Sequence, residues 1–334
     1  MMPGHGHRRH ATQRPGGFGF PVATVVKSRG STGSDKGWNL PLANLQAGAL
    51  AMLIALHVLG PSLSGSVPTI AACAFILVFG LPHGALDLEI VKRERRTGRF
   101  AMVALLLCYL GLAGAMAAIW QLAPVIALAI FLIVAIVHFA EDWPELGSKF
   151  LAQGMAIALL SAPTLFHMAE LRLLFVALSG HSDAALVADF LLLLAPTSLA
   201  VAGVAISTLW RTGSHGQAAA AALTIAGMVL LPPVIGFALF FCLYHSPRHL
   251  GAALARVAWA RSARRVILPI TLAALGIAVA LFAGETRADL SAEVVAASFM
   301  TLSLLTVPHM LIPFVVDALA ARPVGRIVRR GRTT

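Results

Sequence analysis

The stretch from Gln121 to Trp143, QLAPVIALAIFLIVAIVHFAEDW, decides the fold class of this protein. Every side chain from Leu122 to Val137 is apolar, and the run then ends at a histidine followed closely by two acidic residues. A helix over residues 122–141 is long enough to cross a hydrocarbon core of roughly 30 Å. Because imidazole and carboxylate groups are costly in hydrocarbon, their place at the end of this run also indicates a candidate functional site.

The rest of the sequence has the same apolar character. Of its 334 residues, 58% are hydrophobic and 12% are charged, and the mean hydropathy of +0.85 is far above what the core of a soluble domain requires. We therefore predict an all-α protein, a polytopic transmembrane helical bundle of about eight to ten helices. The pattern is ambiguous at 171–191, where a re-entrant segment is an alternative, and at Pro232–Pro233. The candidate helices fall near residues 42–60, 66–88, 100–120, 122–141, 150–168, 184–210, 217–231, 233–250, 265–283 and 292–320.

The basic residues predict how the chain lies in the membrane. The formal net charge of +11 comes from Lys and Arg in short blocks at 92–99, 256–265 and 322–332, a pattern typical of cytoplasmic loops rather than of a nucleic-acid-binding surface. They predict a multi-pass protein of the cell inner membrane with both termini in the cytoplasm. We expect a disordered cytoplasmic tail at 1–40, a transmembrane catalytic domain at 41–321 and a basic cytoplasmic tail at 322–334.

Five histidines fall at corresponding places in the predicted helices. They are His83 in FGLPHGALD, His138 in IVHFAED, His245 and His249 in LYHSPRHL, and His309 in TVPHML. The charge pattern predicts that the helices carrying these five histidines cross the membrane from outside to inside. We therefore expect the histidines at a similar depth in the cytoplasmic half of the membrane. Ionisable groups at such positions usually face a bundle interior and mark a site.

The spacing of these histidines favours a metal site. His245 and His249 are four residues apart and share one helix face, as two ligands of one ion must, although Pro247 between them is expected to kink the helix. Asp87 and Asp142 each follow a histidine by four residues, and such a carboxylate can orient a histidine of another helix. Imidazole ligands with open positions suit Fe(II), Zn or Cu, among which the residues do not choose.

Each candidate also has an ordinary structural interpretation. A single intramembrane histidine can simply form a hydrogen bond between helices, and His309 is either a direct ligand or a residue of the surrounding shell or pocket. Tyr244 precedes the candidate ligand His245 and Trp143 follows Asp142, so both are candidate pocket residues. The same holds for the nearby phenylalanines Phe139, Phe237, Phe240 and Phe241. Packing at the membrane interface explains the same aromatic residues.

Four short motifs together resemble the Brp/Blh family of bacterial and archaeal β-carotene 15,15'-dioxygenases, the membrane enzymes that supply retinal to microbial rhodopsins. The resemblance spans about residues 42 to 320. The motifs are PHGALD at 82–87, HFAEDW at 138–143, YHSPRH at 244–249 and VPHM at 307–310.

The resemblance implies a carotenoid dioxygenase with a non-haem Fe(2+) site, whose ligands match His83, His138, His245 and His249. Such an enzyme adds O2 across the central double bond of β-carotene, releases two molecules of all-trans-retinal and hands them to a microbial rhodopsin. A substrate that dissolves in the lipid bilayer is consistent with a membrane-embedded site, and four imidazoles leave open positions on a six-coordinate ion. The tail at 1–40 and the region 171–217 carry no motif of the family.

Three other functions remain open from the sequence. A membrane di-iron desaturase or hydroxylase of a lipid also uses histidine boxes, but it resembles families with about eight such ligands, more than this chain offers. A membrane transporter or proton relay lined by histidines and acidic residues is a second alternative. A non-catalytic binding partner of a carotenoid or a rhodopsin is the third.

Overall fold

The computed structural model describes residues 48–55, 57, 63, 65–80, 86–95, 98–257, 268–269, 271–273, 275–276, 279–280 and 290–320. His83, the tail predicted at 1–40 and the basic tail predicted at 322–334 lie outside the described residues. Within the described ranges every regular element is helical and no strand occurs, which confirms the predicted all-α class.

Residues 48–55 are helical, and the named helices follow them. Two π-helical segments and three 3-10 turns join or extend these helices. The π-helical segments are Ile76–Gly80 and Phe240–His245, and the 3-10 turns are Pro144–Leu146, Ala162–Leu165 and Ser182–Ala184. The helices are α2 (Ser66–Phe75), α3 (Asp87–Arg95), α4 (Arg99–Leu122), α5 (Pro124–Ala140), α6 (Lys149–Ser161), α7 (Met168–Ser179), α8 (Ala185–Arg211), α9 (His215–Leu230), α10 (Pro233–Leu239), α11 (Ser246–Val257) and α13 (Leu290–Ala320).

Three helices of the described part are long and apolar enough to cross a membrane by themselves. They are α4, the helical stretch Ser182–Arg211 that contains α8, and α13. A fourth span exists if α6 and α7, which meet at an angle of 109°, count as one broken span. Shorter apolar helices, among them α5 and α9, occupy several of the other predicted spans. The described residues therefore contain membrane-type helices, and three or four spans among them are full-length, whereas the predicted ranges 42–60 and 265–283 lie partly outside the described residues.

One predicted helix, 66–88, corresponds to two helical elements in the structure. The range 66–88 contains α2 with its π-helical extension to Gly80, followed by a separate helix that begins at Asp87. The sequence between them contains Pro82 and Gly84, residues that disfavour a continuous helix. The ambiguous region 171–191 contains the end of α7 and the start of α8, and α7 lies at an angle of 109° to the helical stretch that ends at Leu165.

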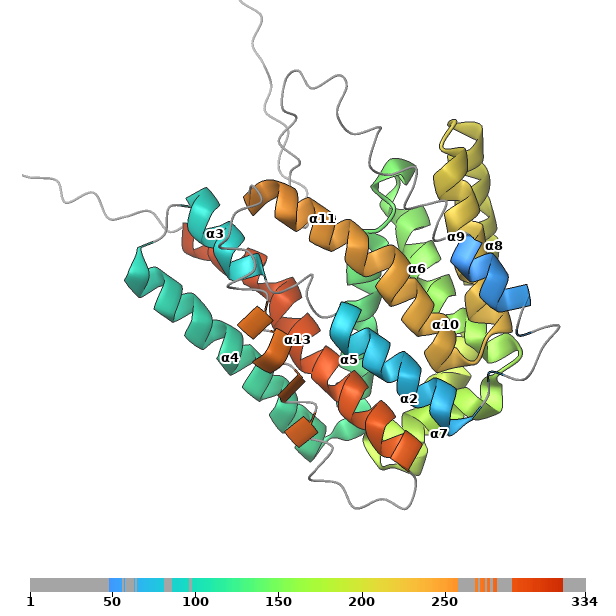
Figure 1. The fold of residues 1–334 in the computed structure, drawn as a ribbon, viewed down its shortest axis with the longest axis horizontal. Helices are drawn as coiled ribbons and strands as arrows, with labels where there is room; N and C mark the ends of the chain where they lie inside the picture. The colour runs from blue at the N-terminus through green and yellow to red at the C-terminus, as the bar shows by residue number, and fades with distance from the viewer. Residues whose placement is uncertain are drawn as a thin grey trace, which may run out of the picture. The chain divides into compact units, whose positions relative to one another are not determined.

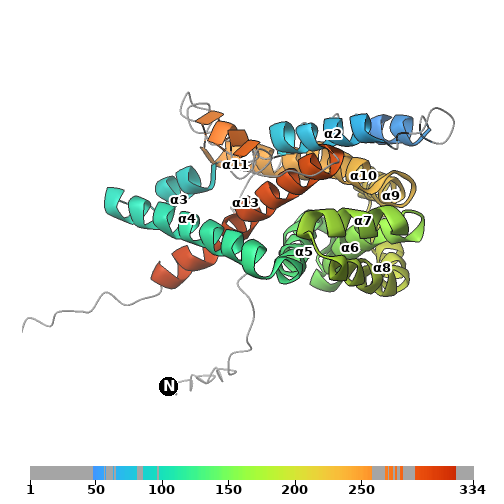
Figure 2. The ribbon, with the colours of Figure 1, turned by 90° about the horizontal axis from the view of Figure 1, so that it is seen from below.

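The helices pack around α5, α6 and α13 (Figures 1 and 2). α6 packs against α5 and α8, and α7 joins α8 to α13. α13 also contacts α2 and α4, and it crosses between them as a long diagonal helix in Figure 2. α10 lies against α2 and α9, and the π-helical segment Phe240–His245 follows it directly. This arrangement brings the ends of α5 and α10 into one buried region with the middle of α13.

Small residues allow the closest of these contacts, between α6 and α8. A Cβ atom added at Gly154 on α6 would lie 2.2 Å from Cγ1 of Val201 on α8, so no larger residue fits there without movement. A few turns away the hydroxyls of Ser161 and Ser198 hydrogen-bond across the same interface at 2.9 Å. Small residues and hydroxyl pairs are the usual means of packing helices in membranes, where apolar burial gives little driving force.

Candidate metal centre and apolar cavity

The π-helical segment Phe240–His245 places His245 in the centre of the protein. Pro247 has no N–H group, and in an α-helix its ring would clash with the carbonyl four residues earlier. The wider π-helical turn before Ser246 accommodates this defect, and such turns are frequent at functional sites. His245 is fully buried there, and its ring stacks on that of Phe241 with centroids 5.2 Å apart.

His138 and His245 face each other through their Nε2 atoms, which are 3.1 Å apart. His138 lies in the last turn of α5 and is 1% exposed. On the other side of the His245 ring, Nδ1 lies 2.8 Å from Oδ2 of the fully buried Asp142 side chain. Because an ionised carboxylate only accepts, Nδ1–H of His245 donates to Asp142, and this leaves the lone pair of Nε2 directed at His138.

His249 completes this group from the first turns of α11. Its Nε2 lies 3.2 Å from Oδ1 of Asp142, and its ring centroid is 4.4 Å from that of His245 and 5.1 Å from that of His138. The two histidines of YHSPRH therefore do share one helix face despite Pro247. Asp142 contacts both of them, one through each carboxylate oxygen.

His309 on α13 approaches from a fourth element. Its ring centroid is 5.0 Å from that of His138, and its Nδ1 donates a short hydrogen bond to Oδ2 of Asp87 at the start of α3. The carboxylates of two motifs thus contact histidines of other motifs: Asp87 contacts His309, and Asp142 contacts His245. Such contacts fix the tautomer and the direction of an imidazole.

The structure thus brings together four of the five predicted histidines, His138, His245, His249 and His309. His83 lies outside the described residues, so its place is not part of this geometry. Oε2 of Glu141, a residue of the HFAEDW motif, lies 3.6 Å from Nδ1 of His138, and the Glu141 side chain is 55% exposed. The cluster is therefore buried at its centre and bordered by acidic groups on one side.

The donor set fits a metal ion. Two nitrogens 3.1 Å apart can both lie about 2.0–2.1 Å from one point, which is the length of a metal–imidazole bond. In addition, Asp142, His245 and His249 each offer a ligand atom, and these three atoms lie within 4.8 Å of one another. Asp142 is therefore suited either to binding the ion or to orienting the imidazoles. In both cases the described residues contain a histidine and aspartate group that could hold a metal.

Trp143 and Tyr244 pack against each other beside the histidines and are not among the residues that line the apolar cavity described below. Both are buried, and their rings stack with centroids 5.9 Å apart. Arg248 donates to the hydroxyl of Tyr244 at 3.3 Å and to Oε1 of Glu145 at 3.0 Å. The same Glu145 oxygen accepts from Gln217 on α9 at 2.6 Å. These contacts connect the HFAEDW and YHSPRH segments to each other and to α9.

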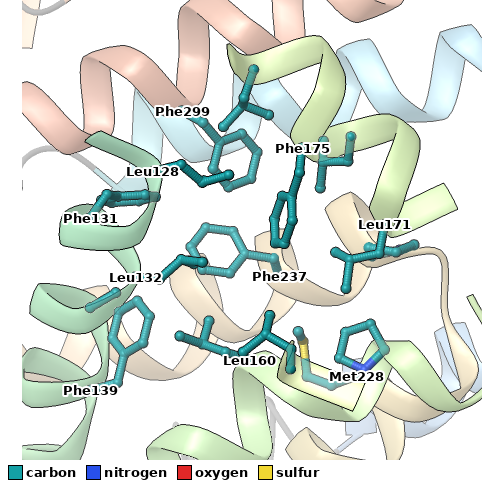
Figure 3. A pocket seen from close by; sticks show the side chains of 16 residues that line it. Leu128, Phe131, Leu132, Phe139, Leu160, Leu171, Phe175, Met228, Phe237 and Phe299 are labelled. Atoms are coloured by element: carbon teal, nitrogen blue, oxygen red, sulfur yellow. The ribbon is translucent and has the colours of Figure 1, made fainter. Parts of the chain in front are cut away.

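An apolar cavity lies beside the histidines (Figure 3). The empty space between its walls, counted out to its open side, is about 580 Å³. Every described side chain in its wall is apolar, and most are buried. The wall comes from seven helices and one 3-10 turn. It consists of Leu128, Phe131, Leu132, Ala135, Phe139, Leu160, Pro163, Leu171, Leu174, Phe175, Leu178, Leu191, Met228, Pro233, Phe237 and Phe299.

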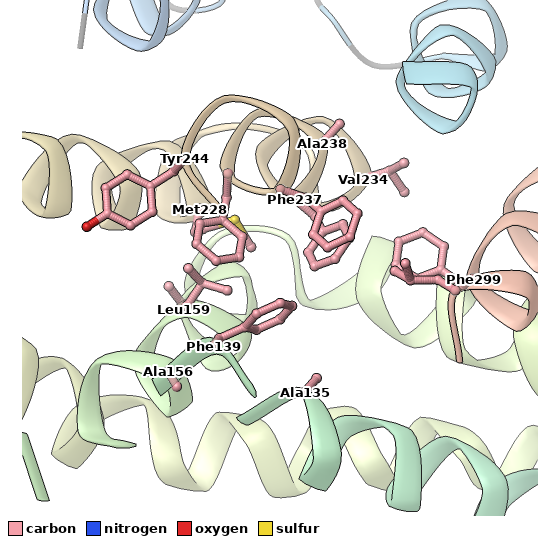
Figure 4. Packing of buried hydrophobic residues seen from close by; sticks show 14 of the residues in the cluster. Ala135, Phe139, Ala156, Leu159, Met228, Val234, Phe237, Ala238, Tyr244 and Phe299 are labelled. Atoms are coloured by element: carbon pink, nitrogen blue, oxygen red, sulfur yellow. The ribbon is translucent and has the colours of Figure 1, made fainter. Parts of the chain in front are cut away.

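Phe139 connects this cavity to the histidine cluster. It lines the cavity, follows His138 in sequence, and its ring centroid is 5.0 Å from that of His245. Figure 4 shows Phe139 facing Phe237, with Tyr244 and Phe299 at opposite ends of the same buried cluster. Phe139 therefore belongs both to the cavity wall and to the surroundings of the imidazoles.

Sequence reasoning did not identify most of the cavity wall. Phe139 and Phe237 were found because they lie close in sequence to histidines, but α7 and α8 contribute residues from a region with no motif. Arg248 and Glu145 stand within or next to the motifs, so their charge in an apolar chain was a signal. Leu171 and Phe175 had no such signal, because apolar residues occur throughout the chain.

Comparisons with known proteins identify relatives of this chain. Residues 74–317 match the profile of the family described as beta-carotene 15,15'-dioxygenase. A beta-carotene 15,15'-dioxygenase of the uncultured marine bacterium 66A03 is 28% identical over 264 residues, covering 72% of this chain and 91% of that protein. A probable beta-carotene 15,15'-dioxygenase Blh of Halobacterium salinarum is 28% identical over 295 residues, covering 75% and 85%. No solved structure matches the chain with comparable significance.

The fold and the site together define a helical protein with membrane-type helices and a buried histidine and aspartate cluster suited to a metal. The profile match covers well over half of the chain, so the chain belongs to the beta-carotene 15,15'-dioxygenase family. This confirms the resemblance that the four motifs indicated, and it places the chain among enzymes named for carotenoid cleavage.

Proposed function

We propose that this protein cleaves β-carotene at its central 15,15' double bond with O2 and releases two molecules of all-trans-retinal, using Fe(2+) bound by histidines. The observation that carries the proposal is the meeting of four imidazoles from different elements beside a cavity with an entirely apolar wall. A metal-dependent reaction on a hydrocarbon needs both parts. The names of the relatives support the choice of substrate.

In this reaction the atoms balance without a further reductant. The central carbon–carbon double bond and the O–O bond break, and each of the two carbons ends as an aldehyde that carries one oxygen atom. No proton or electron is left over. Bound iron(II) would supply the redox chemistry that allows O2 to react with an alkene at ordinary temperature.

The proposed ligands are His138, His245 and His249, with His83 as the fourth. Support for the first three is the mutual contact of their rings. For His138 and His245 the facing Nε2 atoms add to this support, whereas His83 is proposed from its motif alone. His309, held by Asp87, is proposed to border the ion or to serve as an additional ligand. Asp142 is proposed to orient His245 and His249 by accepting their N–H groups.

The apolar residues are proposed to bind the substrate and to exclude water. Phe139, Phe240 and Phe241 lie with ring centroids 5.0–5.9 Å from that of His245, so the centre is enclosed by hydrocarbon on this side. A polyene dissolved in the bilayer can enter an apolar cavity without passing through water. We further propose a multi-pass inner-membrane protein with both termini in the cytoplasm, and a microbial rhodopsin as a recipient of the retinal.

Expression of the full chain in a bacterial strain that accumulates β-carotene tests this function. We expect loss of the orange colour and the appearance of retinal in the chromatogram, both dependent on iron and O2. The purified protein should contain about one iron per chain, whereas a di-iron enzyme would contain about two. Persistence of β-carotene with the protein present in the membrane would contradict the proposal.

A further inference from the structure

The cavity extends a long way from the histidines, along helices that carry them. On α5 its wall runs from Phe139, next to His138, back to Leu128. Leu128 is ten residues before His138, which corresponds to about 15 Å of helix at 1.5 Å per residue. The cavity is therefore deep in one direction from the cluster.

A second helix gives the same depth. On α13 the cavity residue Phe299 also precedes its histidine, His309, by ten residues, again about 15 Å of helix. Figure 3 shows Phe299 beside Leu128, with Phe175 of α7 next to them and Phe139 on the other side of the cavity. These three residues, Leu128, Phe175 and Phe299, form what we call the end wall. Each of them is at most 8% exposed.

We propose that the end wall sets the position at which the polyene is cut. One half of the substrate fills the cavity with its terminal ring against Leu128, Phe175 and Phe299, and the bond that then lies at the histidines is the one cleaved. This inference rests on the proposed function and specifies its regiochemistry. Leu128, Phe175 and Phe299 are specificity-determining residues in this scheme, because they contact the substrate far from the reacting bond.

The reactivity of the substrate does not select one double bond, so the protein must determine which bond is cleaved. Successive double bonds of a conjugated polyene are similar in reactivity, so the histidines alone give no preference for one of them. A conjugated chain is stiff, and the depth to which its ring enters therefore determines which bond reaches the centre. Because β-carotene is a hydrocarbon, no hydrogen bond can fix its register, and the described residues of the wall offer apolar contacts. Contact between the terminal ring and the end wall is therefore the proposed means by which one double bond is selected.

Deepening the cavity provides the first test. In Phe299→Ala the ring should enter farther, so that unequal aldehydes, one longer and one shorter than retinal, rise from a trace to roughly a tenth of the product or more. Phe314→Ala is the matched control on the same helix, because Phe314 is 41% exposed and does not line the cavity. Phe299→Leu and Leu128→Ala are milder variants that carry the test if Phe299→Ala does not accumulate.

Filling the cavity provides the second test. Ala135 lines it one turn before Phe139, so Ala135→Trp, or the smaller Ala135→Leu, should obstruct the half-chain near the centre. We expect at least a tenfold loss of retinal and a similar loss of β-carotene bound by the metal-free protein, measured by its visible absorbance. Ile133→Trp, at a position that is 61% exposed on the same helix, should leave both unchanged.

The outcomes separate the two proposals. If the unaltered protein yields no aldehyde from β-carotene, the proposed function fails. If it yields retinal, and the end-wall variants are active but still yield retinal alone, the end wall does not determine the cleavage position and this inference is wrong. A shift of products in Phe314→Ala as large as in Phe299→Ala would refute it as well.

Discussion

The histidine cluster and the end wall of the cavity share two helices, α5 and α13, but they are held together by different kinds of contact. At the cluster, single atoms matter: His245 contacts His138 through one ring nitrogen and Asp142 through the other. At the end wall, about ten residues back along α5 and α13, contacts are between apolar surfaces without direction. In the proposed function, the first region determines which chemistry occurs, whereas the second determines the size and shape of the substrate that fits. Substitutions in the two regions should therefore impair the protein in different ways.

The largest effect is expected from loss of a central imidazole. His245→Ala removes the ring that contacts both His138 and Asp142, so bound iron and retinal formation should fall together, by more than the ten- to hundredfold loss typical for an outer carboxylate. Iron per chain by mass spectrometry and retinal by chromatography check this. His167→Ala is the control, because His167 lies at the start of α7 and contacts the carbonyl of Leu230 instead. Normal iron content in His245→Ala would contradict the proposed ligand.

A smaller loss is expected from the carboxylate behind the imidazoles. Asp142→Asn keeps the shape of the side chain, but its amide cannot accept hydrogen bonds from both His245 and His249. We expect a loss of about ten- to hundredfold in iron affinity or in kcat/KM. Asp189→Asn, which alters an exposed pair with Arg172, should have little effect. An Asp142→Asn protein equal to the unaltered one in both measurements would exclude an orienting role.

Helix spacing beside the cavity should affect stability before chemistry. Gly154→Ala places a methyl group against Val201, and the resulting overpacking of α6 on α8 should cost about 1–3 kcal/mol. A lower Tm in detergent, with unchanged products, is the expected result. Gly203→Ala on α8 is the control, since nothing lies within 4 Å of its added Cβ. An unchanged Tm in Gly154→Ala would show that the two helices separate more easily than their packing suggests.

The smallest effect concerns the substrate. A carotenoid with a hydroxyl on each terminal ring must place one hydroxyl in the apolar cavity, where no described wall residue offers a hydrogen bond. This should cost about 1 kcal/mol or more, a reduction of roughly fivefold or more in kcat/KM relative to β-carotene. A carotenoid hydroxylated on one ring should react almost normally with its plain ring inserted. Equal rates for all three substrates would show that the ring does not enter this cavity.

Sequence reasoning identified the class and the chemistry of this protein from particular residues. Apolar runs such as 122–137 predicted an all-α protein with membrane-type helices, because an uncharged run of that length has few other uses. The ionisable residues that interrupt these runs predicted the site, and His138, His245, His249 and His309 indeed meet. A polar group in an apolar chain is conspicuous, and this is why single positions could be named.

Only the tertiary structure decided how these residues combine. Pro247 indicated a distortion of its helix, but the π-helical form of that distortion and the angle of 109° between α6 and α7 are evident only in the structure. The contact of Asp87 with His309 joins residues that are 222 positions apart. The end wall is the clearest case: Leu128, Phe175 and Phe299 are ordinary apolar residues in sequence, and they acquire a role because three helices place them around one space. Apolar packing is non-directional, so its specificity comes from arrangement rather than from residue type.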